Sequence, residues 1–536
     1  MPPSLRKQLT WPRLRNLIND HPGEGVLDQD RDRFLPNRGR CSSAIRGKRV
    51  IACALVAVLG LSGATGAAAQ PSELPRLGEA AGDELSPAAE RRLGEAIMRE
   101  IRRSREAFDD SELTDYLNRL AARLALHPAA SGFQFELFAV EDRSINAFAL
   151  PGGFIGVHTG LVAASQAESE LASVIAHEIG HVTQRHIARM LSQSRQTSTI
   201  AMASILAALA AMRSNPQAAM GLASLGSAVQ MQQMLGFSRD AEREADRSGV
   251  EMLQHAGFDP QGMVEFFGRL QSATRLNESS LPPYLRTHPL SSERMTDIQN
   301  RLLGLRYRQH ADSPEFALLK ARFRALSDSS VDGLRRSRAV LVRQIEDGIV
   351  PPFAGHYALA ANAAAAGDWG SAKGSIDRAR EAQRSSHPYV ENLAALIEIE
   401  SGLPRAALQT LDRASRTFGR SRSLERTRVQ ALAALKDWEA GAEVSESALE
   451  SWPDDAQFWE ALARSRAAQG QTARAHLAMA EVHIRKGAWL AAIDQLQSAQ
   501  RTRQLDFYAG SEVDARLRQL RARHLQELED RRAGRL

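Results

Sequence analysis

The chain has 536 residues, of which 43% are hydrophobic and 24% charged, and its formal net charge is +5. This length predicts two or three domains, and the composition excludes a disordered or collagen-like chain. Aromatic residues make up only 5%, and two cysteines cannot form a disulfide framework. A net positive charge is compatible with nucleic-acid binding. Whether it supports such a function depends on where the basic residues lie along the chain.

Residues 1–69 are predicted to be a leader that ends in a cleaved signal peptide. Gly47-Lys-Arg49 precedes an apolar run at 50–61, and small residues then lead to Ala69. A basic stretch, an apolar core and a small-residue end are typical of secretory signal peptides. The uncharged run 50–69 is also nearly long enough for a retained membrane anchor, but its glycines favour cleavage after Ala69.

The leader also carries the excess charge. It holds 11 basic and five acidic residues and both cysteines, Cys41 and Cys53, which leaves 57 basic and 58 acidic residues in the mature chain. No basic field remains to attract a phosphate backbone, so we expect no nucleic acid as a partner. A chain without cysteines is suited to export into an oxidising compartment.

The next elements follow from hydrophobic spacing. Residues 70–86 are predicted to be a linker because they are rich in Pro, Gly and Glu. Leucine and isoleucine recur at helical spacing over 87–127, whereas the alternation at 133–140 indicates a strand. Residues 146–160 indicate a strand, a Pro-Gly-Gly turn and a second strand. Helices are then expected at 167–195, with Ser165 as the cap, and at 239–256 and 260–275.

Beyond residue 310 every element is expected to be helical, with an internal period. Candidate turns are spaced by 35, 34 and 34 residues, at Gly367, Gly402, Lys436 and Gly470. Small residues recur at fixed distances after them. A helix-turn-helix of 34 residues is similar to the tetratricopeptide repeat, so 311–536 is predicted to be an all-α repeat solenoid. Such stacks present concave surfaces to segments of other proteins.

The segment His177-Glu178-Ile179-Gly180-His181 carries the strongest chemical signal. Residues i and i+4 of a helix share a face, so both imidazoles point to one side. Two neutral imidazoles at this spacing suit zinc, and Glu178 can reach a water at the metal. The motif predicts a zinc metallopeptidase, and the alternative is a pair of core histidines.

A catalytic zinc needs a third protein ligand, which the spacing alone leaves open. His186 lies about 180° round a continuous helix from His177, so a surface or structural role is expected for it. A downstream helix offers two acidic pairs on opposite faces. They are Glu242 with Asp246, and Asp240 with Glu244. One carboxylate of a pair can bind the metal while the other orients a histidine ring.

Two segments are candidates for substrate contact. The strand at 154–158 could pair with a substrate backbone by β-addition, or it could be an ordinary buried strand. Residues 190–235 hold six of the 12 methionines. Met-rich surfaces adapt to many partners, so this segment is interpreted as a mobile lid, with a membrane contact or plain core helices as alternatives.

The order of motifs resembles the zinc metallopeptidases that include HtpX and the CAAX-prenyl endopeptidases. The matching segments are Asn146-Ala-Phe-Ala-Leu-Pro-Gly-Gly153, His177–His181, Glu242 with Asp246, and His288-Pro289 with Arg294. The resemblance implies an α+β zincin-type domain at 87–310 with His177, His181 and Glu242 as ligands of one Zn²⁺. It also implies Glu178 as general base, Asp246 as an assisting residue, and His288 as a regulatory extra ligand or a transition-state donor.

The combination of leader, peptidase domain and repeats is similar to the periplasmic β-barrel assembly-enhancing proteases. This similarity implies a Gram-negative periplasmic enzyme, attached to the membrane peripherally rather than integrally. Its implied substrates are unfolded or misassembled outer-membrane β-barrel proteins, and its repeats would dock to the β-barrel assembly machinery. A scaffold or chaperone with a latent zinc site is the alternative.

Overall fold

The computed structural model describes most of the chain after the predicted leader. The described residues are 85–103, 108–193, 238–275, 282–304, 310–383 and 386–532. The predicted signal peptide and residues 194–235 of the Met-rich segment lie outside them, and both interpretations stay predictions. No helix among the described residues has the length and apolarity needed to cross a membrane.

The described residues of the segment at 87–127 are helical, as predicted, and form two helices. They are α2 (Pro87–Arg103) and α3 (Ser111–Leu124). Asp110 starts α3, because its side chain accepts a hydrogen bond from the backbone N–H of Leu113 at 2.9 Å. An aspartate in this position satisfies a free N–H of the first turn. A 3-10 turn (Pro128–Ala130) then leads into the sheet.

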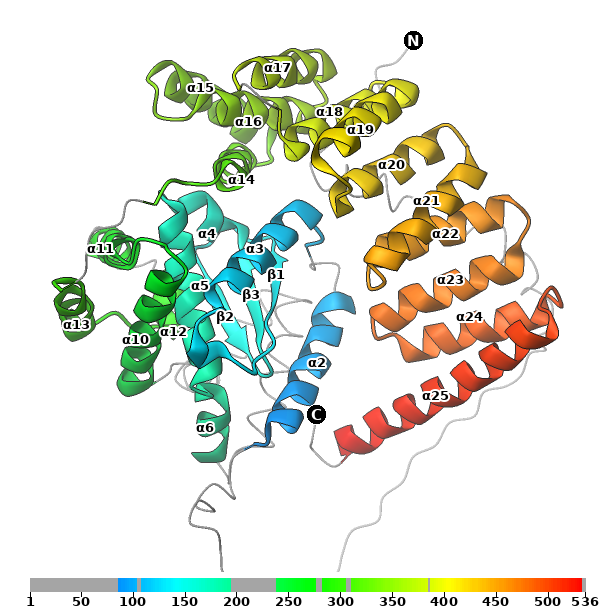
Figure 1. Cartoon of the computed structure of the whole chain (residues 1–536), viewed down its shortest axis with the longest axis horizontal. Helices are drawn as coiled ribbons and strands as arrows, with labels where there is room; N and C mark the ends of the chain where they lie inside the picture. Colours follow the sequence, from blue (N-terminus) through cyan, green and yellow to red (C-terminus); the bar gives the residue numbers. More distant parts are fainter. Residues whose placement is uncertain are drawn as a thin grey trace, which may run out of the picture. The chain divides into compact units, whose positions relative to one another are not determined.

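A three-stranded sheet lies beside the helix that carries the His-Glu-x-x-His motif (Figure 1). Its strands are β1 (Glu136–Val140), β2 (Ala147–Leu150) and β3 (Phe154–His158). β3 is the central strand, because it pairs in parallel with β1 and antiparallel with β2. All of its residues are buried. The proposed substrate pairing at 154–158 is therefore wrong, because both edges of β3 are occupied. Among the described strands, β2 lies at an edge of the sheet.

Seven helices follow the strands among the described residues of the peptidase part. They are α4 (Thr159–Ala164), α5 (Glu168–Thr183), α6 (His186–Gln193), α10 (Arg239–His255), α11 (Gln261–Arg275), α12 (Pro283–Thr287) and α13 (Ser292–Leu302). The single helix expected at 167–195 is broken after Thr183, where Arg185 adopts a φ of 53°. Ser165 does not cap α5; its hydroxyl donates to the carbonyl of Leu161, and Ala167 precedes the first turn.

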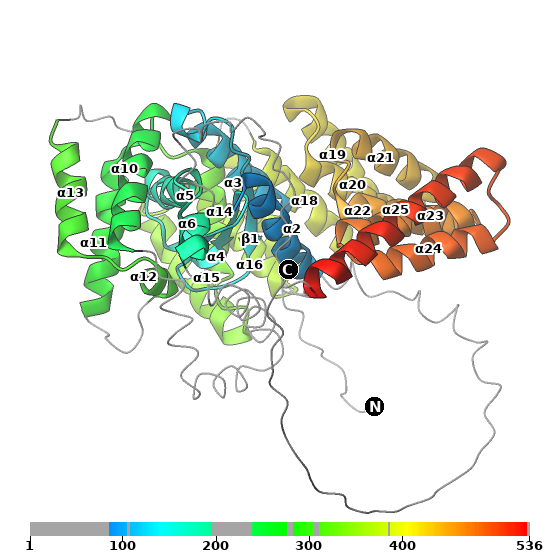
Figure 2. The ribbon, with the colours of Figure 1, turned by 90° about the horizontal axis from the view of Figure 1, so that it is seen from below.

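The described chain after residue 310 is helical, as predicted. Its helices are α14 (Pro314–Ala325), α15 (Val331–Glu346), α16 (Pro352–Ala365), α17 (Trp369–Glu381), α18 (Pro388–Glu400), α19 (Pro404–Phe418), α20 (Arg422–Ala434), α21 (Trp438–Ser451), α22 (Ala456–Ala468), α23 (Thr472–Arg485), α24 (Trp489–Arg501) and α25 (Phe507–Arg532). From α16 onward they form successive antiparallel pairs (Figures 1 and 2).

The predicted turn positions of the repeats are confirmed. Gly367, Gly402 and Gly470 have φ between 74° and 78°, and Lys436 takes the same left-handed conformation at 58°. The small residues that recur after the turns are buried where helices meet. They include Ala372, Ala379, Ala407, Ala414 and Ala448. A side chain larger than glycine is also unfavourable at Gly441, where an added Cβ would lie 3.0 Å from the Ser465 hydroxyl.

One buried cluster joins the two predicted domains. It includes Ile175 of α5, Phe316 of α14 and Tyr357 of α16. A buried hydrogen bond supports the same contact, since Arg322 of α14 donates to Glu112 of α3 at 2.6 Å. The parts of the chain before and after residue 310 therefore pack against each other through apolar and polar side chains. The exact boundary stays a prediction.

Candidate active site

Helix α5 presents the two histidines of the motif on one side, as the i, i+4 spacing predicts. The Nε2 atoms of His177 and His181 are 3.0 Å apart, and both rings are fully buried. Burial follows from the sequence, because Leu171, Val174, Ile175 and Ile179 make the rest of α5 part of the hydrophobic core. The polar side chains of α5 therefore gather on the side that meets α10, α12 and β2.

Helix α10 brings Glu242 to these histidines. The approach is close because Gly180 has no side chain; an added Cβ would lie 2.9 Å from the carbonyl oxygen of Ala245. The Glu242 oxygens lie 3.4 Å from Nε2 of His177 and 3.4 Å from Nε2 of His181. Sequence spacing left two acidic pairs open, and the structure brings Glu242 and Asp246 to the histidines. The Asp240 side chain is instead 81% exposed.

His288 joins the cluster from the end of α12. Its Nδ1 lies 2.9 Å from a carboxylate oxygen of Glu242 and 3.3 Å from Nε2 of His177. Its Nε2 lies 3.4 Å from Oε1 of Glu178. The ring of Tyr284 stacks on His288 with centroids 4.8 Å apart and holds it in this orientation.

The four donors fit a tetrahedral metal ion. One ligand atom from each of His177, His181, Glu242 and His288 lies within 4.8 Å of the other three. Zinc binds nitrogen and oxygen at about 2.0–2.1 Å, which places tetrahedral ligand atoms roughly 3.3 Å apart. The separations of 2.9 to 3.4 Å given above match that spacing. Three imidazoles with one carboxylate also form a donor set that zinc accepts.

Asp246 lies behind the donors. Its carboxylate is 3.0 Å from Nδ1 of His177 and accepts two hydrogen bonds from Arg294 of α13. Burial acts to raise the pKa of Asp246, but Arg294 and His177 outweigh it and lower the pKa. An ionised Asp246 directs Nε2 of His177 toward the other donors. Burial lowers the pKa of His177, yet Asp246 and Glu242 together raise it to about 9.

His186 also lies behind the donors and is buried, so of the two expected roles the surface one is wrong and the structural one stays a prediction. Its Nδ1 is 2.8 Å from Nδ1 of His181, and its Nε2 is 3.0 Å from Glu244. The helical extrapolation failed because the chain turns at Arg185, which folds His186 back onto His181. The sequence carried little warning of this break, since Gln184 and Arg185 are good helix formers.

Glu178 is fully buried next to the edge strand. Burial raises its pKa, and the nearby His288 and His177 act in the opposite direction. The backbone of Ala149 in β2 approaches its carboxylate. The structure therefore brings together all six residues that the sequence singled out, around one buried centre that faces β2.

The comparisons with known proteins agree with this geometry. The model of peptidase family M48 matches residues 108–302. The chain is 31% identical over 482 residues to the Beta-barrel assembly-enhancing protease of Escherichia coli (strain K12), which covers 88% of this chain and 96% of that one. The chain belongs to this protease family. The protein of the same name from Yersinia pestis is 30% identical over 449 residues, covering 84% and 91%.

Another relative matches a shorter part of the chain. Mitochondrial metalloendopeptidase OMA1 of Schizosaccharomyces pombe is 31% identical over 189 residues, which is 35% of this chain and 53% of that one. The family, the relatives and the buried donor cluster make the chain a metalloprotease with a divalent metal.

Proposed function

We propose that the chain is a zinc endopeptidase whose metal is held by His177, His181 and Glu242. The observation that supports this most is the convergence of buried nitrogen and oxygen donors at tetrahedral separations. A zinc ion in this position supplies a Lewis acid that polarises the scissile carbonyl and acidifies the attacking water. The remaining chemistry comes from side chains of this chain.

Glu178 acts as the general base. Its buried carboxylate has a raised pKa, which brings it nearer to the operating pH and makes it a better proton acceptor. It takes a proton from the attacking water and passes it toward the leaving amine. Asp246, held by Arg294, keeps His177 in the orientation that binding requires.

His288 keeps the site closed at rest. Catalytic zinc sites bind three protein groups and leave a fourth position open, whereas structural sites have four protein ligands. With a metal bound, the Nδ1 atom of His288 would be the fourth donor, since it lies 2.9 Å from Glu242 and 3.3 Å from Nε2 of His177. The loop that carries His288 must withdraw before substrate is cleaved. This observation also favours the second candidate function, a repeat scaffold or chaperone with a latent zinc site.

Substrate adds to the edge of the sheet at β2. Among the described strands, β2 (Ala147–Leu150) pairs with β3 alone, and the backbone of its Ala149 lies beside Glu178. β-addition binds the backbone of an extended peptide and so tolerates many sequences. An unfolded chain can supply such a strand, whereas a folded barrel has all its strands paired.

The substrates are unfolded or misassembled outer-membrane β-barrel proteins in the periplasm. The names of the two long relatives and the near-neutral, cysteine-free mature chain support this assignment. The repeats dock the enzyme to the β-barrel assembly machinery, because helical repeat stacks bind segments of other proteins.

Proteolysis of one barrel protein in two states tests the assignment. The zinc-loaded chain is expected to cleave the urea-unfolded barrel protein and to leave the folded barrel intact, with no cleavage of the unfolded form by Glu178→Gln. Equal digestion by the wild type and Glu178→Gln would favour the scaffold function, with the cleavage due to a contaminant.

A further inference from the structure

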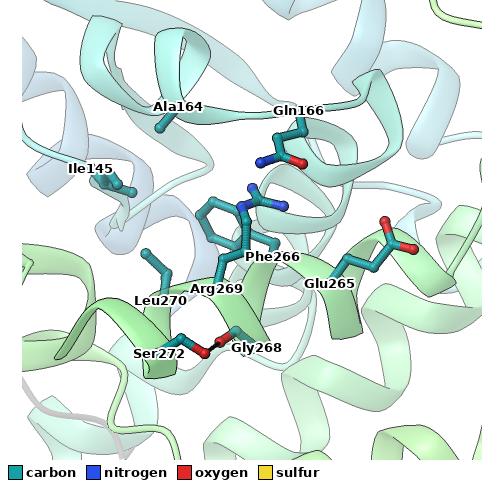
Figure 3. Close-up of a pocket in the computed structure, with 9 residues that line it drawn as sticks. All are labelled: Ile145, Ala164, Gln166, Glu265, Phe266, Gly268, Arg269, Leu270 and Ser272. Atoms are coloured by element: carbon teal, nitrogen blue, oxygen red, sulfur yellow. Dashed lines mark hydrogen bonds between the residues drawn. The ribbon is translucent and has the colours of Figure 1, made fainter. Parts of the chain in front are cut away.

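A pocket of about 710 Å³ lies beside the predicted path of the substrate. One wall is α11, which contributes Phe266, Gly268 and Leu270. The facing wall is formed by Ala164 at the end of α4 and by Ile145, which precedes β2 (Figure 3). Its size is within the usual range for ligand sites, which is roughly 300–1,000 Å³.

Contacts through Tyr284 link the walls of the pocket to the donor cluster. The carbonyl of Ile145 accepts a hydrogen bond from the backbone N–H of Tyr284 at 3.3 Å. The ring of Phe266 lies 6.2 Å from that of Tyr284, and Tyr284 stacks on His288. Two contacts therefore join the walls of the pocket to the residue that positions His288.

The lining of the pocket combines an apolar wall with the side chains of Gln166 and Ser272 and the exposed carboxylate of Glu265, and it disfavours an acidic side chain. Ile145, Ala164, Phe266 and Leu270 are apolar. The guanidinium of Arg269 forms an ion pair with the buried carboxylate of Glu170, which neutralises its charge. An acidic side chain would find no unpaired cation in this lining.

The direction of β2 places the pocket on one side of the cleaved bond. β2 runs from Ala147 to Leu150, so its start lies nearer to Ile145 and its Ala149 nearer to Glu178. A substrate strand added antiparallel, which is the commoner pairing, then runs toward Ile145 with its C-terminal part. Four residues of strand span roughly 13 Å, which reaches the second to fourth residue after the cleaved bond.

We propose that this pocket is a substrate subsite for a large apolar or aromatic side chain, two to four residues after the cleaved bond. The inference rests on the proposed peptidase function and on strand addition at β2. Strands of β-barrel membrane proteins alternate apolar and polar residues, so an unfolded barrel strand regularly presents such a side chain on one face.

Gly268 allows the pocket to be filled without disturbing the fold. An added Cβ at this helical glycine meets no atom within 4 Å, so Gly268→Phe extends into open space at the pocket. Replacing a glycine within a helix also favours the helix. Gly374 of α17 is a matched control, since it too is a half-buried helical glycine whose added Cβ meets nothing within 4 Å.

The test compares cleavage sites in the full-length, zinc-loaded chain. Unfolded casein and an unfolded outer-membrane barrel protein are digested by the wild type, Gly268→Phe, Gly268→Ala and Gly374→Phe, and the new termini are mapped by mass spectrometry. The wild type and Gly374→Phe are expected to favour Leu, Phe or Tyr at one position two to four residues after the cut. Gly268→Phe is expected to shift that preference at least tenfold toward small residues, with Gly268→Ala between them, since a single methylene in such a pocket changes specificity by about 10-fold or more.

Two results would overturn the inference. The first is an active Gly268→Phe that keeps the wild-type cleavage pattern; if this variant does not fold, the same result with Gly268→Ala counts instead. The second is a change in preference that is confined to residues before the cut. Both leave the peptidase function intact. A zinc-loaded wild type that cleaves neither substrate would instead refute the proposed function and the subsite with it.

Discussion

Arg294 holds Asp246 by two parallel hydrogen bonds, from Nε at 2.7 Å and from Nη2 at 2.8 Å. Both side chains are about 2% exposed, and the carboxylate continues to Nδ1 of His177 at 3.0 Å. This contact links α13 through α10 to the motif helix α5. The orientation of the His177 ring thus depends on a residue far along the chain.

Arg294→Lys is expected to weaken zinc binding by about 10- to 100-fold, because lysine cannot make the two-point contact that fixes Asp246. Competition with a fluorescent zinc chelator measures the affinity. Arg301→Lys is the control, since Arg301 lies on the same helix in an exposed pair with Asp297. Equal affinities in all three proteins would contradict the role given to Arg294.

His186→Ala is expected to weaken zinc binding by about 10-fold, because it removes the partner of Nδ1 in His181. The absorption spectrum of the cobalt-substituted protein should shift as well, since a freed His181 ring changes the ligand field. His255→Ala, at an exposed histidine of α10, serves as the control. A cobalt spectrum and zinc affinity identical to the wild type would show that His186 is only structural.

His288→Ala is expected to raise the initial rate of cleavage of an unfolded protein several-fold at unchanged zinc content. The substitution removes the fourth donor and leaves the open position that a catalytic zinc requires. The double variant His288→Ala with Glu178→Gln should be inactive, which ties the gain to the same site. A rate as low as that of Glu178→Gln alone would instead identify His288 as a transition-state donor.

The contact between peptidase and repeats is expected to depend on pH through Glu112. Burial raises the pKa of Glu112 to about 7, although Arg322 acts to lower it. The folded state therefore keeps a proton that the unfolded chain loses near pH 4.5. The associated stability is fully present below that pH and is lost as the pH rises through about 7.

Glu112→Gln stays uncharged at every pH, so its Tm relative to the wild type should rise between pH 5.5 and pH 8.5. Thermal unfolding across this range measures the difference. The opposite trend would mean that Arg322 keeps Glu112 ionised in the fold and lowers its pKa.

Much of the site followed from local spacing. The i, i+4 rule placed His177 with His181 on one helix face and paired Glu242 with Asp246 on another. It could not choose between Glu242 and Glu244, because that choice depends on how α10 rotates against α5. The close contact at Gly180 sets this rotation, and it exists only in the folded chain.

Elements that depend on long-range pairing were harder to predict. The sequence at 146–160 indicated two strands around a Pro-Gly-Gly turn, but the central position of β3 follows from its pairing with both β1 and β2. The position of His186 beside His181 depends on the left-handed backbone conformation of one residue, Arg185. The repeat turns were easier, because their period located even Lys436, where no glycine marks the left-handed position.

The central claim is that Glu178 performs proton transfer at a metal held by His177, His181 and Glu242. The most direct measurement is the initial rate at which zinc-loaded wild type and Glu178→Gln cleave the same unfolded barrel protein, with bound zinc quantified in both. We predict equal zinc content and a rate at least about 100-fold lower in Glu178→Gln. Equal zinc content with equal rates would contradict the claim.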